Sequence, residues 1–519
     1  MEESLQGPTV GELVLRSIRR YGSREALVDG DRRLTYAQMG ARVSQLVQAM
    51  RAGGVTRGAG LCQLTANSID ALLIRTAAQL LGARLAVLNP LSGAEEHAFI
   101  ARDSESTFLI SDPAFAGSVT HMVEASSLLQ QVWATGTCAF GENLNSLADA
   151  YTPQPLVDES RAGDITQLVY TGGTTGIPKG VVHKHRATVA STIHMCAEFE
   201  WPVAPRFLVV TALSHAGGGL VLPVWVQGGT VILQAGFDPA GFLACIERER
   251  VSAAWLVPTM IYRLLDYPGL KDADVSSLRL MIYGGSPIQP SVLEAALDRF
   301  GPVFLQLYAQ REASMPLTTL NTWDHDLSQP ERLASCGYPS SGLQVSLLDD
   351  GDQPVAAGEV GEICVRGPVV MEGYWNRPEE TERALRNGWL HTDDMGRQDQ
   401  AGFIYIVDRK KDMIISGGFN VYPKEVEDVL TRHPGVAQAA VIGVPDEKWG
   451  EKVLAVVVCN GGAQVRADEL IALVKDSKGS VLAPKAVDFV DAIPVTSVGK
   501  PDKKALRARY WADEDRQVH

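Results

Sequence analysis

One short stretch, residues 170–180 with the sequence YTGGTTGIPKG, has a composition suited to binding a polyphosphate. Glycines let consecutive backbone N–H groups converge on an anion, threonine hydroxyls add donors, and Lys179 brings a compact positive charge. The spacing is not that of a Walker A loop, because Ile177 and Pro178 separate the last glycine from the lysine. On composition alone, a disordered surface loop is an almost equally good interpretation. The residues that would contact the phosphates are Thr171, Gly172, Gly173, Thr174, Thr175, Gly176 and Lys179.

Five other short motifs place polar or charged residues near glycines or turns, and each has an ordinary structural interpretation when read alone. His215 in ALSHAGGG lies near an apolar run, where packed core histidines are common. The glycines of YGGSPI fit a tight turn between a strand and a helix. The paired aspartates of GWLHTDDMG fit a solvated turn, the charges of DRKKD fit a solvated face, and the lysine of SVGKPDKK fits an exposed turn.

The elements around these motifs are predicted to alternate between helices and buried strands. Two capping boxes, Thr9 with Glu12 and Thr35 with Gln38, predict amphipathic helices that flank a hairpin turned at residues 29–30. Short apolar runs bounded by Gly, Pro and Asn predict buried strands of α/β sheets, namely ARLAVLN, DITQLVY, RFLVVTAL, AAWLVPT, LRLMIYGG and VFLQLYA. The glycine and threonine loop directly follows the second of these runs.

The pattern changes in the last third of the chain. From about residue 335 to residue 406, strands and turns alternate with little helix, which predicts a β-rich subdomain. Pro423 can then start a helix, and two strands, a helix and a further strand follow, which predicts a small α+β domain. We place the domain boundary near Lys411, with a large α/β domain at 1–410 and a small domain at 411–519.

Composition and charge exclude several classes of protein. The 519 residues are 45% apolar and 21% charged, as in a globular protein of more than one domain. The formal net charge of -14 argues against general binding to nucleic acid or anionic membranes. We find no leader of basic and apolar residues and no transmembrane segment, and the seven cysteines lie too far apart for a zinc motif. We therefore expect a cytoplasmic protein with reduced thiols.

Taken together and in their order along the chain, the motifs resemble those of the adenylate-forming superfamily, which contains acyl-CoA synthetases, nonribosomal-peptide adenylation domains and luciferases. The glycine and threonine loop is similar to the family form YTSGTTGxPKG, with Gly172 in place of the serine. The resemblance covers nearly the whole chain. It implies ATP, Mg²⁺ and CoA as ligands, and a small C-terminal domain that reorients between two half-reactions.

The resemblance also implies a nucleotide site assembled from several motifs. Tyr308 in LYAQREAS would stack on adenine, Glu312 would hold Mg²⁺, Asp394 in GWLHTDDMG would accept both ribose hydroxyls, and Arg409 in DRKKD would add a second ribose contact. A carboxylate suits the ribose because it can accept from two donors at once. Besides the loop, the residues assigned to ATP or AMP are Gly284, Gly285, Ser286, Tyr308, Ala309, Arg311, Asp394, Arg409 and Lys500.

Catalysis, acid binding and CoA binding are assigned by the same resemblance. Lys500 would be the catalytic lysine of the small domain, acting with Lys179 and Glu312 of the large domain, because an ammonium ion can neutralise the charge that develops as pyrophosphate leaves. Lys411 would be the hinge between the domains. The expected acyl-pocket residues are His215, Gly284 and Ala309, and the expected CoA-tunnel residues are Ser416, Gly417, Gly418 and Phe419.

Two substitutions depart from the family motif around Tyr308. Ala309 stands for glycine and Arg311 stands for threonine, so a full charge and a planar fork of donors replace one hydroxyl. This arginine could strengthen the contact to phosphate or misplace the nucleotide. In GWLHTDDMG, Asp393 likewise stands for glycine.

The favoured interpretation is an acyl-CoA synthetase that converts a carboxylic acid to acyl-AMP and then to acyl-CoA. The pocket stretches offer apolar walls and no evident charge, which favours a bulky hydrophobic acid, whether fatty, aromatic or polycyclic. One alternative is an enzyme restricted to one half-reaction, and another is a catalytically silent nucleotide-binding scaffold. Neither a nucleic-acid partner nor an integral membrane segment is expected, and the oligomeric state is left open, with a homodimer as one option.

Overall fold

The computed structural model describes residues 7–171, 177–416, 419–446, 449–461, 463–495 and 501–510, which form a mixed α/β fold. The chain divides into two compact units. The first comprises Met1–Val345 and Val365–Leu390, and the second comprises Ser346–Cys364 and His391–His519. Most of the β-rich stretch is therefore grouped with the C-terminal part of the chain. The boundary near Lys411 stays a prediction.

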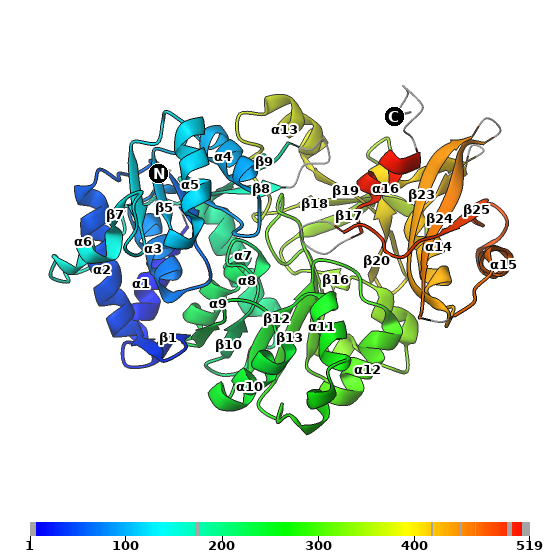
Figure 1. Cartoon of the computed structure of the whole chain (residues 1–519), viewed down its shortest axis with the longest axis horizontal. Helices are drawn as coiled ribbons and strands as arrows, with labels where there is room; N and C mark the ends of the chain where they lie inside the picture. Colours follow the sequence, from blue (N-terminus) through cyan, green and yellow to red (C-terminus); the bar gives the residue numbers. More distant parts are fainter. Residues whose placement is uncertain are drawn as a thin grey trace. The chain divides into compact units, whose positions relative to one another are not determined.

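A nine-stranded sheet is the larger of two sheets in the first unit (Figure 1). Its strands, in sheet order, are β16 (Tyr338–Pro339), β15 (Thr318–Leu320), β14 (Phe304–Tyr308), β13 (Leu280–Gly284), β12 (Ala253–Leu256), β10 (Arg206–Val209), β11 (Thr230–Leu233), β1 (Glu25–Asp29) and β2 (Arg32–Thr35). The six strands from β14 to β1 are parallel, and the three others pair antiparallel at the edges. The predicted hairpin at residues 29–30 is confirmed as β1 and β2.

A seven-stranded sheet carries the glycine and threonine loop. Its strands, in sheet order, are β7 (Glu142–Asn143), β6 (Gln131–Ala134), β5 (Phe108–Ser111), β3 (Gly60–Leu64), β4 (Arg84–Val87), β8 (Ile165–Thr171) and β9 (Lys179–Lys184). All neighbours are parallel except β8 and β9, which form an antiparallel pair at one edge. The loop is thus the connection between two strands of a hairpin.

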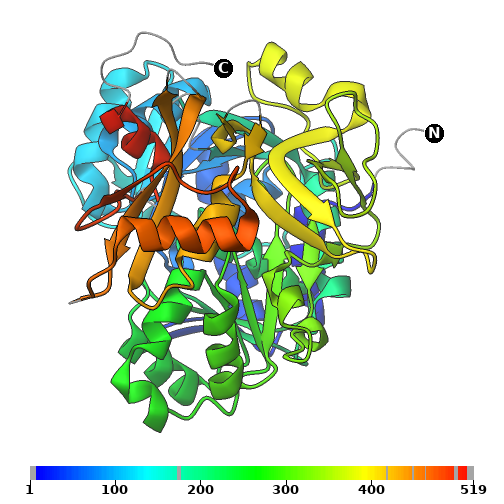
Figure 2. The same ribbon diagram turned by 90° about the vertical axis from the view of Figure 1, so that its right-hand side faces the viewer.

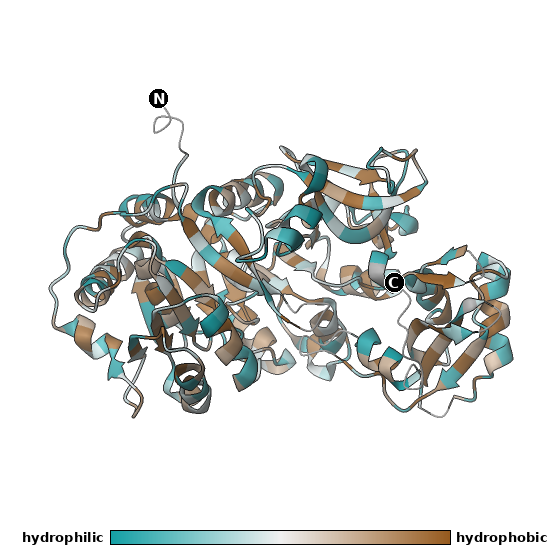
Figure 3. Cartoon of the chain, turned by 90° about the horizontal axis from the view of Figure 1, so that it is seen from above, coloured by the Kyte–Doolittle hydropathy of each residue, from teal (hydrophilic) through white to brown (hydrophobic). Residues whose placement is uncertain are grey.

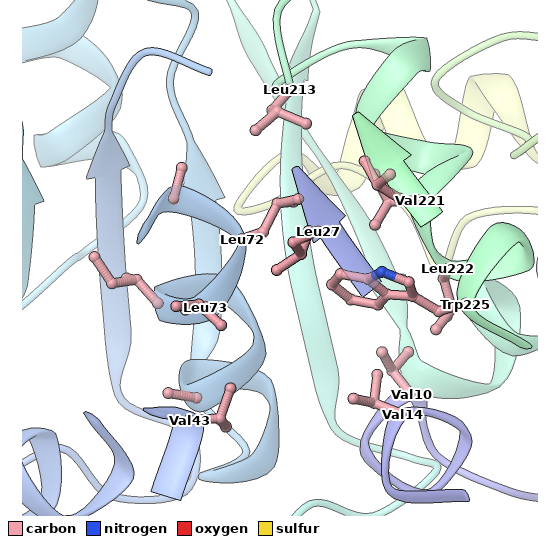
Figure 4. Packing of buried hydrophobic residues seen from close by; sticks show 14 of the residues in the cluster. Val10, Val14, Leu27, Val43, Leu72, Leu73, Leu213, Val221, Leu222 and Trp225 are labelled. Atoms are coloured by element: carbon pink, nitrogen blue, oxygen red, sulfur yellow. The ribbon is translucent and has the colours of Figure 1, made fainter. Parts of the chain in front are cut away.

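One large apolar cluster draws residues from both sheets of the first unit and from the helices between them. Figure 4 shows Leu27 of β1 with Leu72 and Trp225 close by, and Val10 and Val14 beneath the indole. These side chains come from α1 (Val10–Arg20), α3 (Ile69–Leu80) and α9 (Val221–Val226), and the cluster also includes residues of α2 (Tyr36–Ala52), α6 (Leu144–Asp149) and α7 (His185–Glu198). The predicted capping boxes at the starts of α1 and α2 are confirmed.

Smaller apolar clusters cover other faces of these sheets. One joins the nine-stranded sheet to α10 (Pro239–Glu249), α11 (Pro258–Leu265) and α12 (Pro290–Phe300). Another joins the seven-stranded sheet to α4 (Ala94–Asp103) and α5 (Ala116–Ala125). The first unit also contains α8 (Ala216–Gly219) and α13 (Pro378–Ala384). Sheets covered by helices in this way bury their strands on both faces, which explains the apolar runs in the sequence.

The second unit contains most of a four-stranded sheet and a separate C-terminal sheet. The four-stranded sheet has the order β17 (Gln344–Leu348), β18 (Val360–Arg366), β19 (Leu390–Gln398) and β20 (Ile404–Arg409). The C-terminal sheet has the order β22 (Phe419–Val421), β21 (Ile414–Ser416), β24 (Gly450–Cys459) and β23 (Val436–Asp446), with β25 (Ala486–Phe489) paired to β24.

Three helices accompany the C-terminal sheet: α14 (Pro423–Leu430), α15 (Ala467–Lys478) and α16 (Lys503–Tyr510). Figure 2 shows α15 lying against this sheet, where Leu470 and Val474 join the apolar cluster of the strands. The helix predicted to start at Pro423 is confirmed as α14. On its other side the sheet packs against Leu506 of α16.

Apolar residues are concentrated in the strands of the sheets, and the outer faces of the helices are mostly hydrophilic (Figure 3). None of the helices in the described part of the chain is both long and apolar enough to cross a bilayer. All seven cysteines are free thiols, and four of them are buried.

Candidate active site

The strand pair β8 and β9 positions the two ends of the glycine and threonine loop. Thr171 at the end of β8 is the register partner of Lys179 at the start of β9, so these two residues face each other across the base of the loop. The loop residues Gly172, Gly173, Thr174, Thr175 and Gly176 lie outside the described residues. The sequence prediction that the loop follows a strand is confirmed, although only two residues of β8 are fully buried, and the phosphate contacts of the loop remain a prediction.

Lys179 lies beside an aromatic residue that the sequence analysis did not select. Its Nζ atom is 5.1 Å from the ring centroid of Tyr374, and the hydroxyl of the same tyrosine donates a hydrogen bond of 2.9 Å to Oε1 of Glu312. A cation over an aromatic face is attracted by the ring quadrupole. Tyr374 therefore contacts both the loop lysine and the glutamate expected to hold Mg²⁺.

Residues 369–375 join β9 to the segment that carries Glu312. Val182 donates to the carbonyl of Gly373 at 2.9 Å, and Trp375 donates to the carbonyl of Gly180 at 2.7 Å. On the other side, the N–H of Met371 donates to the carbonyl of Glu312 at 2.8 Å. This extended segment thereby brings Lys179 and Glu312 to one place, although the two residues are far apart in the sequence.

Arg311 follows β14 and directly precedes Glu312 in the chain. Burial lowers the pKa of its guanidinium, although Glu312 and Glu96 act in the opposite direction. Within the described part of the chain, no hydrogen bond or ion pair is formed by this guanidinium, and its backbone carbonyl receives a 2.6 Å contact from Nε2 of His183. A mostly buried guanidinium that has no partner among the described residues is suited to binding an anionic ligand.

His215 caps the short helix α8 and is held in the neutral form. Its pKa is lowered to about 4, first by burial and second by the positive charge of Arg311. Nδ1 lies 3.0 Å from the hydroxyl of Ser214. An alanine and then three glycines follow His215. At Gly218 there is no room for a side chain, because a Cβ there would lie 1.9 Å from the carbonyl oxygen of Leu213. The His215 ring itself is therefore uncharged at neutral pH.

The turn after β13 and the end of β14 lie side by side. Gly284 is the register partner of Leu307, and a Cβ on Gly284 would lie 2.4 Å from the Leu307 carbonyl oxygen. Gly285 has φ +83°, a conformation that L side chains rarely adopt. The predicted adenine and acyl-pocket residues Gly284, Gly285, Ser286, Tyr308 and Ala309 are thus brought together at the ends of two adjacent strands.

In the second unit, Asp394 and Arg409 form an ion pair across β19 and β20. Nε of Arg409 is 3.2 Å from Oδ1 of Asp394, whose side chain is mostly buried. The backbone N–H of Asp394 donates to the hydroxyl of Thr392 at 3.1 Å. Asp393 has φ +57°, which aspartate tolerates better than most residues and which explains how it replaces the glycine of the family motif. The two predicted ribose contacts therefore lie next to each other.

A buried polar cluster lies behind Asp394. Nδ1 of His391 is 3.1 Å from Oε2 of Glu362 and 3.3 Å from Sγ of Cys364, a grouping that could hold a metal ion. However, the ammonium of Lys410 already lies 3.5 Å from the same glutamate oxygen. Burial alone would raise the pKa of Glu362, but the hydrogen bonds from His391 and from the backbone of Asp393, with the charge of Lys410, lower it. We assign this cluster to holding β18 and β19 together.

Four predicted site residues of the second unit cannot be placed. Gly417, Gly418 and Lys500 lie outside the described residues, as does the side chain of Lys411. Residues next to them are held by backbone pairing. Ser416 is the register partner of Phe419 across β21 and β22, and Val495 forms an isolated bridge with Pro501. The side chain of Phe419 is 59% exposed. The CoA, hinge and catalytic-lysine assignments stay predictions.

The sequence matches two family models. The model described as AMP-binding enzyme covers residues 14–375, and the model described as AMP-binding enzyme C-terminal domain covers residues 425–500. The chain is 46% identical to a medium/long-chain-fatty-acid–CoA ligase, FadD8, of Mycobacterium tuberculosis, over 99% of this chain and 93% of the relative. It is 37% identical to a feruloyl-CoA synthase of Amycolatopsis sp, over 96% of this chain and 99% of that protein.

Solved structures show the same fold. The amide bond synthetase McbA from Marinactinospora thermotolerans is 34% identical, with a TM-score of 0.89 over 97% of this chain and 100% of that one. A fatty acyl CoA synthetase from Mycobacterium tuberculosis is 29% identical, with a TM-score of 0.79 over 97% of this chain and 98% of that one. The fold and family expected from the motifs are confirmed. The chain therefore belongs to the AMP-binding enzymes of the adenylate-forming superfamily, and within them it is an acyl-CoA synthetase.

Proposed function

We propose that this acyl-CoA synthetase activates a hydrophobic acid of the fatty type, with Mg·ATP and CoA as cosubstrates, in the cytoplasm. His215 supports a hydrophobic acid, because a histidine whose pKa is lowered to about 4 presents an uncharged ring at neutral pH. Close by, Gly218 packs against the backbone of Leu213 and adds no polar side chain. The medium/long-chain-fatty-acid–CoA ligase that shares 46% identity with the chain favours a fatty acid over an aromatic one.

In the first half-reaction, a carboxylate oxygen of the acid attacks the α-phosphorus of ATP, and the bond to the pyrophosphate group breaks. We assign Lys179 and Arg311 to the phosphates, since both carry positive charge near Glu312. We assign Lys500 to the charge that develops as pyrophosphate leaves. In the second half-reaction, the CoA thiolate attacks the acyl carbon, and AMP leaves. The enzyme contributes positioning and charge stabilisation to both steps.

Glu312 is the residue that we assign to Mg²⁺. Its Oε1 accepts the hydrogen bond from Tyr374, and among the described residues Oε2 has no hydrogen-bond or ion-pair partner. Mg²⁺ prefers carboxylate oxygens and usually takes one or two of them together with substrate phosphates. A bound Mg²⁺ would neutralise part of the charge of the triphosphate. The donor set therefore fits the ion.

One observation carries the proposal: Arg311 directly precedes Glu312 in the chain, and its guanidinium is also close enough to His215 for its charge to act on that ring. The residue assigned to the metal and the residue assigned to the acyl group are therefore near the same guanidinium. Such an arrangement places the carboxylate end of an acid next to the phosphates of ATP, as adenylate formation requires.

A pyrophosphate-release assay tests the proposal. Saturated acids of increasing chain length, ferulate and benzoate are each supplied with Mg·ATP, with and without CoA. We expect release with the fatty acids and formation of the CoA thioester when CoA is present. The primary amide of the best acid is the control, because it lacks the attacking oxygen and should give no release. Release with ferulate or benzoate alone would contradict the fatty assignment.

A second candidate is an enzyme that forms the adenylate but transfers the acyl group to an acceptor other than CoA. Ala309 and Arg311 depart from the family motif. The amide bond synthetase of similar fold, at 34% identity, also favours this candidate. Pyrophosphate release without thioester formation in the presence of CoA would select it.

A silent scaffold would bind ATP but release no pyrophosphate with any acid. Sedimentation velocity would test for a homodimer.

A further inference from the structure

Tyr374 lies between two residues of opposite charge and contacts both of them. Its ring faces the ammonium of Lys179 at 5.1 Å, and its hydroxyl donates to the carboxylate of Glu312 at 2.9 Å. Across the described residues, no ion pair of 4.0 Å or less joins Lys179 to Glu312. One aromatic side chain therefore contacts both groups, which form no direct ion pair with each other among the described residues.

The backbone of Tyr374 is fixed on two sides, so that its ring has a defined place. It forms an antiparallel bridge with Val181 of β9. Its N–H donates to the hydroxyl of Thr381 in α13 at 2.9 Å. Because β9 also carries Lys179, the backbones of the tyrosine and the lysine belong to one hydrogen-bonded framework.

We propose that Tyr374 is a positioning residue that holds Glu312 ready for Mg²⁺ and Lys179 ready for the phosphates, and that keeps these two charges from neutralising each other before ATP binds. The inference rests on the roles proposed above for Lys179 and Glu312. A lysine and a glutamate at this range attract each other, and a direct pair would have to be broken each time Mg·ATP entered. The neutral phenol hydroxyl of Tyr374 binds the carboxylate through one oxygen, and the other oxygen has no partner among the residues that the structure describes.

Two substitutions distinguish the contribution of the Tyr374 hydroxyl from that of its ring. Tyr374→Phe removes the hydroxyl, and with it the hydrogen bond to Glu312, but keeps the ring, whereas Tyr374→Leu also removes the aromatic face beside Lys179. ATP binding is measured by calorimetry at a series of Mg²⁺ concentrations, without acid and without CoA. For Tyr374→Phe we expect a roughly tenfold higher Mg²⁺ requirement, the loss typical of one hydrogen bond to a charged group, with Mg²⁺-free ATP affinity unchanged. For Tyr374→Leu we expect the Mg²⁺-free ATP affinity to fall as well.

A matched control and a double variant test whether the effect is specific to this position. Tyr405→Phe removes a similar hydrogen bond, since the Tyr405 hydroxyl donates to Oδ2 of Asp399 at 3.0 Å, and it should leave the Mg²⁺ dependence unchanged. In a Glu312→Gln background, Tyr374→Phe should add no further change, because both substitutions act on one metal ligand.

A wild-type Mg²⁺ dependence in Tyr374→Phe, or fully additive effects in the double variant, would overturn the inference. Because these titrations need neither acid nor CoA, they can fail while pyrophosphate release succeeds. Conversely, a substrate screen that yields no pyrophosphate would reject the proposed function, and the expected result of the Mg²⁺ titration with Tyr374→Phe would stay the same.

Discussion

The Nε atom of Arg409 lies 3.2 Å from Oδ1 of Asp394, and the two residues face each other across strands β19 and β20. The arginine side chain is half exposed, whereas that of the aspartate is mostly buried, so the pair holds the carboxylate in place while the arginine stays accessible. Both residues were assigned to the ribose from sequence motifs, and the strand pairing explains how residues fifteen positions apart can serve one sugar.

Asp394→Asn should weaken ATP binding about tenfold, because an amide keeps only one of the two acceptors offered to the ribose hydroxyls. The Michaelis constant for ATP and direct ATP binding are measured together. Asp393→Asn is the control, because the side chain at that position is exposed and asparagine tolerates its positive φ. Equal ATP affinity in Asp394→Asn and wild type would remove Asp394 from the nucleotide site.

Lys500→Ala should slow adenylate formation by roughly 100-fold or more, which is the scale for loss of a group that stabilises transition-state charge. ATP affinity should change little, because the lysine acts on charge that is absent from bound ATP. Single-turnover formation of acyl-AMP measures the effect. Lys504→Ala, at an exposed position of α16, is the control. An unchanged single-turnover rate in Lys500→Ala would exclude the residue from this step.

Arg311→Thr, which restores the family residue, should raise the Michaelis constant for ATP about tenfold if the guanidinium binds phosphate. It should also raise the pKa of His215 from its value of about 4, because the charge of Arg311 contributes to that lowering. The Michaelis constant for ATP is measured by steady-state kinetics, and the pKa of the His215 ring is measured by NMR titration. Should neither the ATP constant nor the His215 titration move, the arginine would be a neutral replacement.

The stability of the first unit should fall as the pH drops from about 6.5 toward 4. Burial lowers the pKa of His325 to about 4. In the unfolded chain, the histidine takes up a proton near pH 6.5. Above that pH the ring is neutral in both states, and the folded state has its full stability. As the pH falls from 6.5 toward the folded pKa of about 4, the unfolded state gains the proton first, so the free energy of unfolding decreases. This lowering corresponds to about 3 kcal/mol. Urea unfolding of wild type and His325→Gln at pH 7 and pH 4.5 measures the loss, which should shrink in the variant.

Local elements could be predicted from sequence because short-range chemistry determines them. The capping boxes of α1 and α2 are formed by side chains three residues apart, and the apolar runs became β4, β8, β10, β12, β13 and β14. The substitution of Asp393 for glycine is similarly explained by one backbone angle. In each case the interaction that decides the conformation lies within a few residues of the motif.

Long-range contacts could not be predicted in the same way. Nothing in EGYWNRP resembles a strand, so neither its pairing to β9 nor the approach of Tyr374 to Lys179 and Glu312 was expected. The only signal was an aromatic residue beside a glycine in a turn, which is common in proteins. The pairing of β1 with β11 also joins distant segments, and no local pattern distinguishes it from pairing with another buried strand.

The apolar cluster shared by the two large sheets has a consequence for how the first unit comes apart. Leu61 and Leu85 of one sheet pack in the same cluster as Leu27 and Val231 of the other, so neither sheet can expose its inner face to water without exposing the other's. Hydrogen exchange in β3 and in β11 should accordingly require the same cooperative opening, and the two sheets should denature as one block.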